Sequence, residues 1–287
     1  MDRLRGLVEL TRPVNAIAAG VLTLIGAYVA GGIATESFQA GMAGAATVLA
    51  AGAGNTINDY FDREIDRINA PDRPIPRGAV TPREALIFSV VSFIVAIVLA
   101  FTLPTLAIAI AAVDLVALIA YTELFKGLPG VGNVVVACLG GSTFLFGGAA
   151  VAGNDLAMAS SNLAVVGTLA VLAALSTITR EIVKDVEDIV GDREEGLNTL
   201  PIAIGERASL SLALACTILT VLVSPLPYLL GTFGIAYLVV VIPADVILLL
   251  ASVESFRDPT AAQSHIKYGM FLAAAAFVAG RAVPLSL

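Results

Sequence analysis

The chain is poor in the residues that bind soft metals and in those that keep soluble proteins hydrated. It has no tryptophan, one histidine and two cysteines, and only 14% of its 287 residues are charged. A lone histidine, His265, makes no metal site, and we expect it in a surface loop. Cys138 and Cys216 lie far apart in apolar segments, so we expect small buried side chains with neither a disulfide nor a metal pair. Without tryptophan, an aromatic belt at a membrane surface would come from tyrosine and phenylalanine.

Apolar side chains are what the chain has in excess. They make up 58% of the sequence, with a mean hydropathy of +0.92, whereas a soluble domain is about 45–50% apolar and about 25% charged. This composition predicts an all-α polytopic membrane protein in contact with the lipid bilayer. The net charge of −7 argues against nucleic acid as a partner. The first apolar run is long and lacks a clear cleavage site, so we expect a retained span and no signal peptide.

The apolar runs predict nine transmembrane helices in a bundle around a central cavity, since a span needs about 20 apolar residues. Thr102-Leu103-Pro104 is typical of a tight turn between the third and fourth helices, and Ser224-Pro225-Leu226-Pro227 between the seventh and eighth. Many glycines and alanines suit closely packed membrane helices. The predicted spans are residues 14–32, 38–57, 83–102, 104–122, 131–152, 162–183, 207–224, 230–252 and 268–285.

Lysine and arginine gather on one side of this predicted bundle. All except Arg281 precede the first span or lie in every second connection, helix ends included, and the other connections have none. By the positive-inside rule, the N-terminus and the charged loops are cytoplasmic and the C-terminus is outside the cell. The same loops carry most of the acids. We therefore expect a charged cytoplasmic cap, with only short turns on the opposite face.

The first acidic stretch follows the second span. Because each helical residue turns about 100°, four of its polar side chains would share one helix face within roughly 100°. These are Asn58, Asp59, Asp62 and Asp66. Carboxylates so close repel one another unless a divalent cation or a cationic cluster lies among them. A solvated acidic helix end is the alternative.

A second acidic stretch follows the sixth span, on the same side of the membrane. If its helix continues to the end, four carboxylates lie within about 60° of one another, although Gly191 is a potential break. They belong to Glu181, Asp185, Asp188 and Asp192. Two such faces are harder to explain by solvation than one. Hard oxygen ligands suit Mg²⁺, which keeps several waters and bridges to substrate phosphates.

Phosphate also requires cations, and several lie beside the acidic stretches. In Arg73-Pro74-Ile75-Pro76-Arg77 the prolines stiffen the loop, and guanidinium groups suit bidentate phosphate contacts. Lys126 ends the fourth span, Lys184 lies within the second acidic stretch, and Arg12 precedes the first span. Each of these cations has a simpler alternative role as a positive-inside anchor.

Together these motifs resemble those of the UbiA superfamily of intramembrane prenyltransferases, and the resemblance covers essentially the whole chain. It rests on Asn58-Asp59-x-x-Asp62-x-x-x-Asp66, on the two arginines after it and on Asp185-x-x-Asp188-x-x-x-Asp192. In that family two aspartate-rich motifs hold Mg²⁺ and the diphosphate of an isoprenyl donor. The resemblance implies one intramembrane prenyltransferase domain over residues 1–287, with Mg²⁺ as cofactor. The implied metal ligands are Asn58, Asp62, Asp66, Asp185, Asp188 and Asp192.

The same resemblance implies roles for other polar residues. A Tyr/Lys element of the family matches Tyr121 and Lys126, with a spacing one residue longer than the family pattern. The residues expected to act in catalysis are Asp62, Asp188, Lys126 and Arg77. Those expected to bind substrate are Arg12, Asn15, Arg73, Arg77, Tyr121, Lys126 and Lys184.

Within the superfamily the chain is most similar to the archaeal digeranylgeranylglyceryl phosphate synthase branch, through the second acidic stretch, Thr199-Leu200-Pro201 and residues 266–270. This implies an isoprenyl diphosphate donor, geranylgeranyl diphosphate, and a membrane-borne lipid phosphate acceptor, with no obligatory protein partner. An aromatic or haem acceptor is the alternative within the superfamily. A transporter is a more distant one, although transporters usually place such groups near the midplane. The signature of the CDP-alcohol phosphotransferases is absent.

Two acids, Asp114 and Asp245, fall inside predicted spans. Intramembrane acids are costly, so these two either line the cavity or pair across helices with a hydroxyl or amide. Asn133, at the start of the fifth span, is expected to contact substrate or to cap its helix. The base that takes the proton of the acceptor hydroxyl stays open between a motif carboxylate and a diphosphate oxygen.

Overall fold

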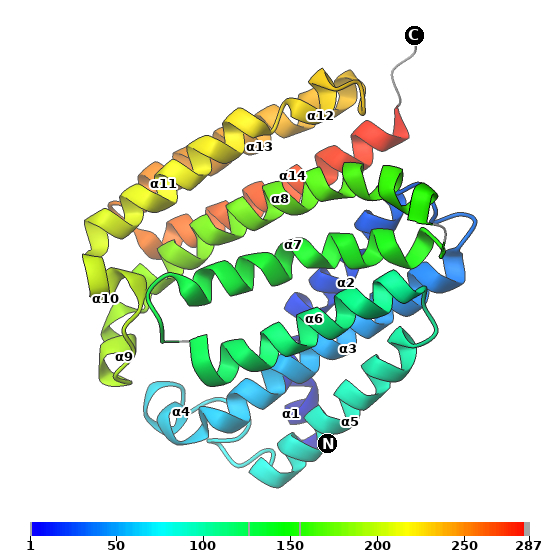
Figure 1. Cartoon of the computed structure of the whole chain (residues 1–287). Coiled ribbons are helices and arrows are strands. Elements are labelled where there is room, and N and C mark those ends of the chain that lie inside the picture. Colours follow the sequence, from blue (N-terminus) through cyan, green and yellow to red (C-terminus); the bar gives the residue numbers. More distant parts are fainter. Residues whose placement is uncertain (1, 126, 155, 284–287) are drawn as a thin grey trace.

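The computed structural model of the protein describes residues 2–125, 127–154 and 156–283, and within them all regular structure is helical, with no strand. The all-α prediction is therefore confirmed. Long helices run side by side as a bundle (Figure 1). Its first half comprises α1 (Asp2–Leu10), α2 (Pro13–Val29), α3 (Ser37–Phe61), α4 (Arg63–Asn69), α5 (Pro82–Ala100), α6 (Thr105–Ala120) and the π-helical turn η1 (Tyr121–Phe125).

The second half repeats this pattern of long helices with short ones between them. Each of the nine predicted spans falls on a long helix of the structure, although several boundaries differ. The helices of this half are α7 (Val131–Val151), α8 (Leu156–Glu187), α9 (Ile189–Glu194), α10 (Leu200–Ile204), α11 (Glu206–Val223), α12 (Leu226–Leu229), α13 (Ile235–Glu254) and α14 (Pro259–Ala282).

Five helices of the described chain are long and apolar enough to cross a membrane, and a sixth span results if α1 and α2, bent by 47°, are counted together. α6 is apolar but shorter. Predicted spans also fall on α3 and α14, which are 25 and 24 residues long. The structure thus supports a multi-pass membrane protein, and the count of nine crossings stays a prediction.

Three local predictions were wrong. His265 lies in α14, because Pro259 at the first helical position and the Asp258 side chain, which accepts from the Ala261 N–H, start this helix earlier than expected. Cys138 is exposed and Cys216 is partly exposed, so neither is a buried side chain, although both are free as expected. The eighth helix begins at Ile235, after the separate turn of α12.

Glycines permit the closest helix crossing in the bundle. A Cβ added at Gly147 of α7 would overlap the backbone of Thr23 on α2, and one at Gly26 would overlap the backbone of Phe144. The two helices therefore touch backbone to backbone, as small residues allow in membrane bundles. Around this crossing, aromatic side chains of α13 and α14 fill the core, with Tyr237 and Phe277 rings 5.1 Å apart.

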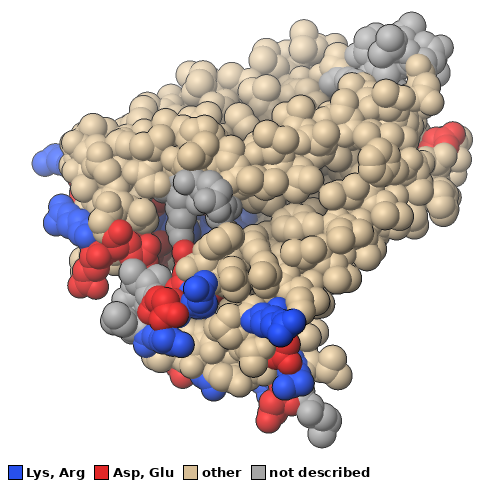
Figure 2. Space-filling view, turned by 60° about the horizontal axis from the view of Figure 1, so that its bottom comes forward, with Lys and Arg blue, Asp and Glu red and all other residues tan. Residues whose placement is uncertain are grey.

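Charged side chains gather at one end of the bundle. Figure 2 shows them around one end, while most of the visible face is free of them. α1, α4 and α9 lie at that end (Figure 1). Many large apolar side chains are exposed along the helices, such as Val91, Ile94 and Val98 of α5, which is the surface expected of helices that face lipid.

Candidate active site

The first acidic stretch forms a helix with a break. α3 ends at Phe61, and Asp62, with φ −80° and ψ 1°, separates it from α4. Backbone hydrogen bonds still continue across the break, from Asp62 N–H to Asn58 and from Asp66 N–H to Asp62. The prediction of one unbroken helix is therefore wrong, and the chain changes direction at Asp62.

Asp59 and Asp66 form a buried ion-pair network with two arginines. The Arg12 Nη2 donates to Asp59 Oδ1 at 2.8 Å, and Arg73 Nη1 lies 2.6 Å from Asp66 Oδ2 and 3.4 Å from Asp59 Oδ1. The two aspartates are only 4% and 5% exposed. A buried carboxylate needs such partners, because leaving it unpaired is strongly unfavourable. Asp59, which was not among the predicted site residues, is thus the centre of this network.

The charges in this network shift the pKa values of one another. Burial raises the pKa of Asp59, and the Arg12 and Arg73 guanidiniums oppose that rise. For Arg73, burial alone would lower the pKa, but the hydrogen bond to Asp66 and the nearby charges of Asp59, Asp66 and Asp62 outweigh it and raise the pKa. Arg73 therefore stays fully charged where it meets the acidic stretch.

Arg77, the second arginine of the proline loop, points elsewhere. Its guanidinium pairs with Glu9 of α1 and donates to the Asp72 carbonyl at 2.7 Å. The loop therefore spreads its two guanidiniums, with Arg73 on the acidic stretch and Arg77 against α1. The structure does not bring them together as one clamp.

The second acidic stretch breaks in the same way as the first. α8 ends at Glu187, and Asp188, with φ −87° and ψ 2°, precedes α9. The interruption falls at Asp188 and not at Gly191, where a break was considered, and Asp188 takes nearly the same backbone conformation as Asp62. Lys184 Nζ lies 3.8 Å from Asp188 Oδ2 at the surface.

Two neighbours position the other carboxylates of this stretch. Asn133 Nδ2 donates to Asp185 Oδ2 at 2.7 Å, and Thr199 Oγ1 donates to Asp192 Oδ2 at 3.0 Å. Asn133 therefore orients a carboxylate and does not cap α7, whose cap residue is Gly130. Asn133 lies on the facing helix, 52 residues before Asp185, so the sequence alone did not reveal this role.

Tyr121 opens the π-helical turn η1. α4 and α9, the short helices that follow the two acidic stretches, lie at the same end of the bundle (Figure 1). That the two stretches share one site stays a prediction. Lys126, the other half of the Tyr/Lys element, lies outside the described residues.

The donor set of these stretches fits Mg²⁺, because it consists of carboxylate and amide oxygens. Within residues 2–125, 127–154 and 156–283, no three Asp, Glu, His or Cys side chains converge closely enough to form a metal cage.

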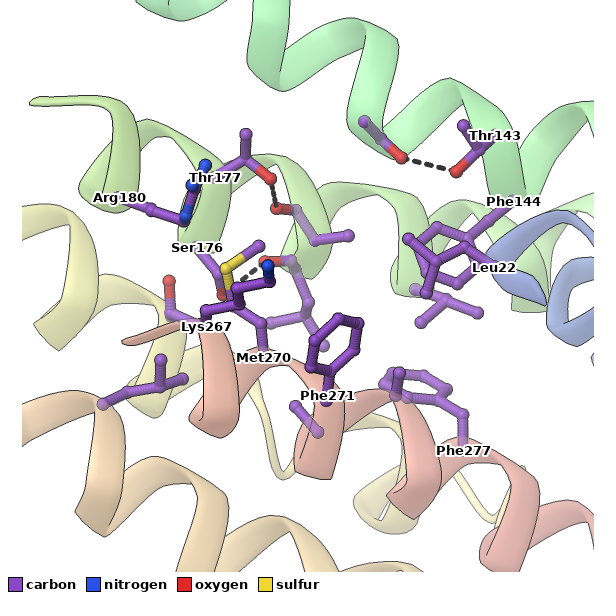
Figure 3. A pocket seen from close by; sticks show the side chains of 18 of the residues that line it. Leu22, Thr143, Phe144, Ser176, Thr177, Arg180, Lys267, Met270, Phe271 and Phe277 are labelled. Atoms are coloured by element: carbon purple, nitrogen blue, oxygen red, sulfur yellow. Dashed lines mark hydrogen bonds between the residues drawn. The ribbon is translucent and has the colours of Figure 1, made fainter. Parts of the chain in front are cut away.

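A cavity of about 350 Å³ adjoins this region, between α2, α7, α8, α11, α13 and α14. Most of its lining is apolar, including Phe144, Phe271 and Phe277 (Figure 3). Arg180 and Lys267 also line it, and neither was among the predicted site residues. Asn15, which was predicted to bind substrate, lines it too. A dry cavity of this size suits a small ligand or part of a larger one.

The two intramembrane acids pair with hydroxyls of other helices, as one of the two sequence alternatives expected. Ser142 Oγ donates to Asp114 at 2.8 Å, and Ser224 Oγ donates to Asp245. Asp245 also lines the cavity, whereas Asp114 does not.

Comparisons with known proteins agree on one family. The model of the UbiA prenyltransferase family matches residues 19–275. A digeranylgeranylglyceryl phosphate synthase of Natronomonas pharaonis is 63% identical over 281 residues, 98% of each chain. A solved structure of a digeranylgeranylglyceryl phosphate synthase has 34% identity and a TM-score of 0.80, over 98% of this chain and 99% of that one. A UbiA homolog from Archaeoglobus fulgidus bound to GPP and Mg²⁺ shares the fold, with 17% identity and a TM-score of 0.65 over 97% of this chain and 100% of that one.

Proposed function

Since the chain belongs to the UbiA prenyltransferase family, we propose that it transfers a geranylgeranyl group from geranylgeranyl diphosphate to geranylgeranylglyceryl phosphate. The product is digeranylgeranylglyceryl phosphate, an intermediate of archaeal ether lipids. In this reaction the allylic C–O bond of the donor breaks and an ether C–O bond forms, while diphosphate and the hydroxyl proton leave. The observation that carries the proposal is the 63% identity, over 98% of both chains, to a synthase of that name.

Mg²⁺ is the proposed cofactor. The oxygen donors of both acidic stretches support this, and so does the Mg²⁺ bound with an isoprenyl diphosphate in a homolog of the same fold. When bound, the ion would neutralise the leaving diphosphate as a Lewis acid. Asn58, Asp62 and Asp66 would hold it on one side, and Asp185, Asp188 and Asp192 on the other. Asn133 would keep Asp185 turned toward this site.

The cations of the charged end would complete the diphosphate site. Arg73 is fixed and charged beside Asp66, so it is preorganised to meet negative charge that grows as diphosphate departs. Arg12, Lys126 and Lys184 are the further proposed contacts, whereas Arg77 is turned toward Glu9 of α1. We assign direct roles in bond breaking to Asp62, Asp188 and Lys126, and a substrate contact to Tyr121.

The mostly apolar cavity would shelter the substrates around the reaction centre. Its lining would limit the water that could capture an allylic cation, and aromatic side chains such as Phe271 and Phe144 attract positive charge. The proposed topology is nine crossings, with the N-terminus and a charged cap on the cytoplasmic side and the C-terminus outside. The exposed apolar helix surfaces and the charges at one end support this arrangement.

An acceptor panel tests the function. The purified full-length chain, in lipid, would receive labelled geranylgeranyl diphosphate with either geranylgeranylglyceryl phosphate or 4-hydroxybenzoate. We expect a labelled product only with the lipid phosphate, and none in excess EDTA. Prenylation of the aromatic acceptor without reaction of the lipid phosphate would overturn the proposal.

A further inference from the structure

Among the described residues, Arg180 carries the buried side-chain polar atom that has no hydrogen-bond partner, its Nε. Its Nη1 donates to Glu181 at 2.7 Å and its Nη2 lies 3.5 Å from Gln263 Oε1, but its buried Nε has no hydrogen-bond partner. Buried donors are almost always paired, so an orphan of this kind needs an explanation. The guanidinium lines the cavity, so a ligand there would satisfy it.

Lys267 supplies a second cation at the same place. It belongs to α14, about one helical turn after Gln263, whose Oε1 lies 3.5 Å from Arg180 Nη2. Arg180 and Lys267 both line the cavity (Figure 3). In the described part of the chain, Lys267 Nζ donates one weak hydrogen bond, to Asn15 Oδ1 at 3.5 Å. Its ammonium group is therefore available to an anion.

The other polar groups of the lining are already paired within the protein. Ser176 and Thr177 hydroxyls bond back to carbonyls of their own helix, at 2.9 and 2.8 Å, and Asp245 is paired with Ser224. Thr143 and Thr220 hydroxyls also donate to carbonyls of their own helices, at 2.7 and 2.9 Å, and the remaining lining is mostly apolar and aromatic. The cavity thus offers one cationic pair and an apolar interior, which matches an anionic head with a hydrocarbon tail.

Along α8, the residues that line the cavity precede the carboxylates of the proposed diphosphate site. Ser176, Thr177 and Arg180 face the cavity, whereas Asp185 faces Asn133 of α7. Five residues at about 1.5 Å and 100° each place Asp185 roughly 7–8 Å along the helix from Arg180 and on a different side. Two phosphate ligands can therefore bind on neighbouring faces of one helix.

We propose that Arg180 and Lys267 bind the phosphate of the acceptor lipid, whose hydrocarbon tail occupies the cavity. This assignment rests on the proposed function. Arg180 provides a planar fork of donors and Lys267 a point charge, a combination suited to a phosphate monoester. The acceptor hydroxyl, a few bonds from its phosphate, is thereby held toward the carboxylate side of α8.

The test separates the two substrates. Arg180→Gln and Lys267→Gln would be assayed for KM of each substrate, beside Arg257→Gln, a basic exposed residue of the α13–α14 connection that lines no part of the cavity. Hydrogen bonds to charged groups predict a rise of about 10- to 100-fold in the acceptor KM for each cavity variant. The donor KM should change less than about twofold, as should both constants of the control.

A second acceptor makes the test specific for phosphate recognition. Geranylgeranylglycerol, which lacks the phosphate, should be a poorer acceptor than geranylgeranylglyceryl phosphate for the parental protein and nearly equal to it for Arg180→Gln. Arg180→Lys, which keeps the charge, should recover part of the preference. A merely structural arginine would leave the preference intact, and that result overturns the inference.

The remaining outcomes are also decisive. A rise in the donor KM alone would assign the cations to the donor diphosphate and overturn the inference, although the proposed function would stand. A parental protein that prenylates neither glycerol lipid would reject the proposed function itself.

Discussion

Asp59 is a buried carboxylate shared by two arginines, so replacing it tests how the charged end of the bundle is held together. Asp59→Asn keeps the size of the side chain but removes its charge. Arg12, at 2.8 Å, then loses its ion pair with Asp59, and Arg73, at 3.4 Å, loses a weaker one and keeps Asp66.

The expected loss of folding stability depends on how deeply the paired charges are buried. Removing one partner of a buried ion pair costs about 3–5 kcal/mol. Here the Arg12 and Arg73 side chains are 41% and 37% exposed, so water solvates them once the carboxylate has gone. We therefore expect a loss near the strength of one charge-assisted hydrogen bond, about 2 kcal/mol. For a chain of this size that corresponds to a fall in Tm of about 4–8 °C.

Because the chain has no tryptophan, thermal unfolding is best followed by helical circular dichroism of the purified protein. Glu64→Gln is the matched control, since it removes the 2.6 Å pair between Glu64 and Arg67, both 64% exposed. An exposed pair three residues apart on a helix contributes about 0.2–0.5 kcal/mol, so its Tm should fall by about 2 °C or less. Equal shifts for the two variants would refute the idea that Asp59 secures this end.

Further predictions concern the metal and the helix crossing. Asp62→Ala and Asp188→Ala should each lower turnover at saturating Mg²⁺ by at least about 100-fold, the range expected when electrostatic stabilisation of the leaving group is lost; near-parental turnover in either variant, or activity that persists in EDTA, would reject the metal assignment. Gly147→Ala should strongly reduce the yield of folded protein, because its Cβ would overlap the α2 backbone. Gly167→Ala, with nothing within 4 Å of its Cβ, should leave stability unchanged or raise it by about 0.5–1 kcal/mol, and equal yields of the two variants would contradict the close crossing.

Helix positions were the most predictable part of this molecule, because a run of apolar residues long enough to span a bilayer has few other structures open to it. Ends were harder. His265 was expected in a loop, yet Asp258 and Pro259 start a helix before it. The breaks at Asp62 and Asp188 were not predicted either, because the periodicity of polar residues does not specify the backbone angles of single residues.

The acidic and basic side chains of the charged end were predictable, but the pairings among them were not. Two acidic stretches indicated a shared cation and phosphate site, and the helices that follow them, α4 and α9, lie at the same end of the bundle (Figure 1). Sequence could not show that Arg12 contacts Asp59, 47 positions away. Nor could it place Lys267 and Arg180 in the lining of one cavity, because both cations also fit the simpler role of positive-inside anchors.

The division of α8 into two functional faces has a consequence for how relatives of this protein can diverge. Residues proposed to contact the acceptor and residues proposed to bind the donor follow one another along one helix, yet point to different neighbours. A substitution at Thr177 or Arg180 can therefore change the accepted molecule while Asp185 and its Asn133 contact stay as they are. In such a bundle, new acceptor specificity can evolve one residue at a time, without an intermediate that has lost the ability to bind the donor.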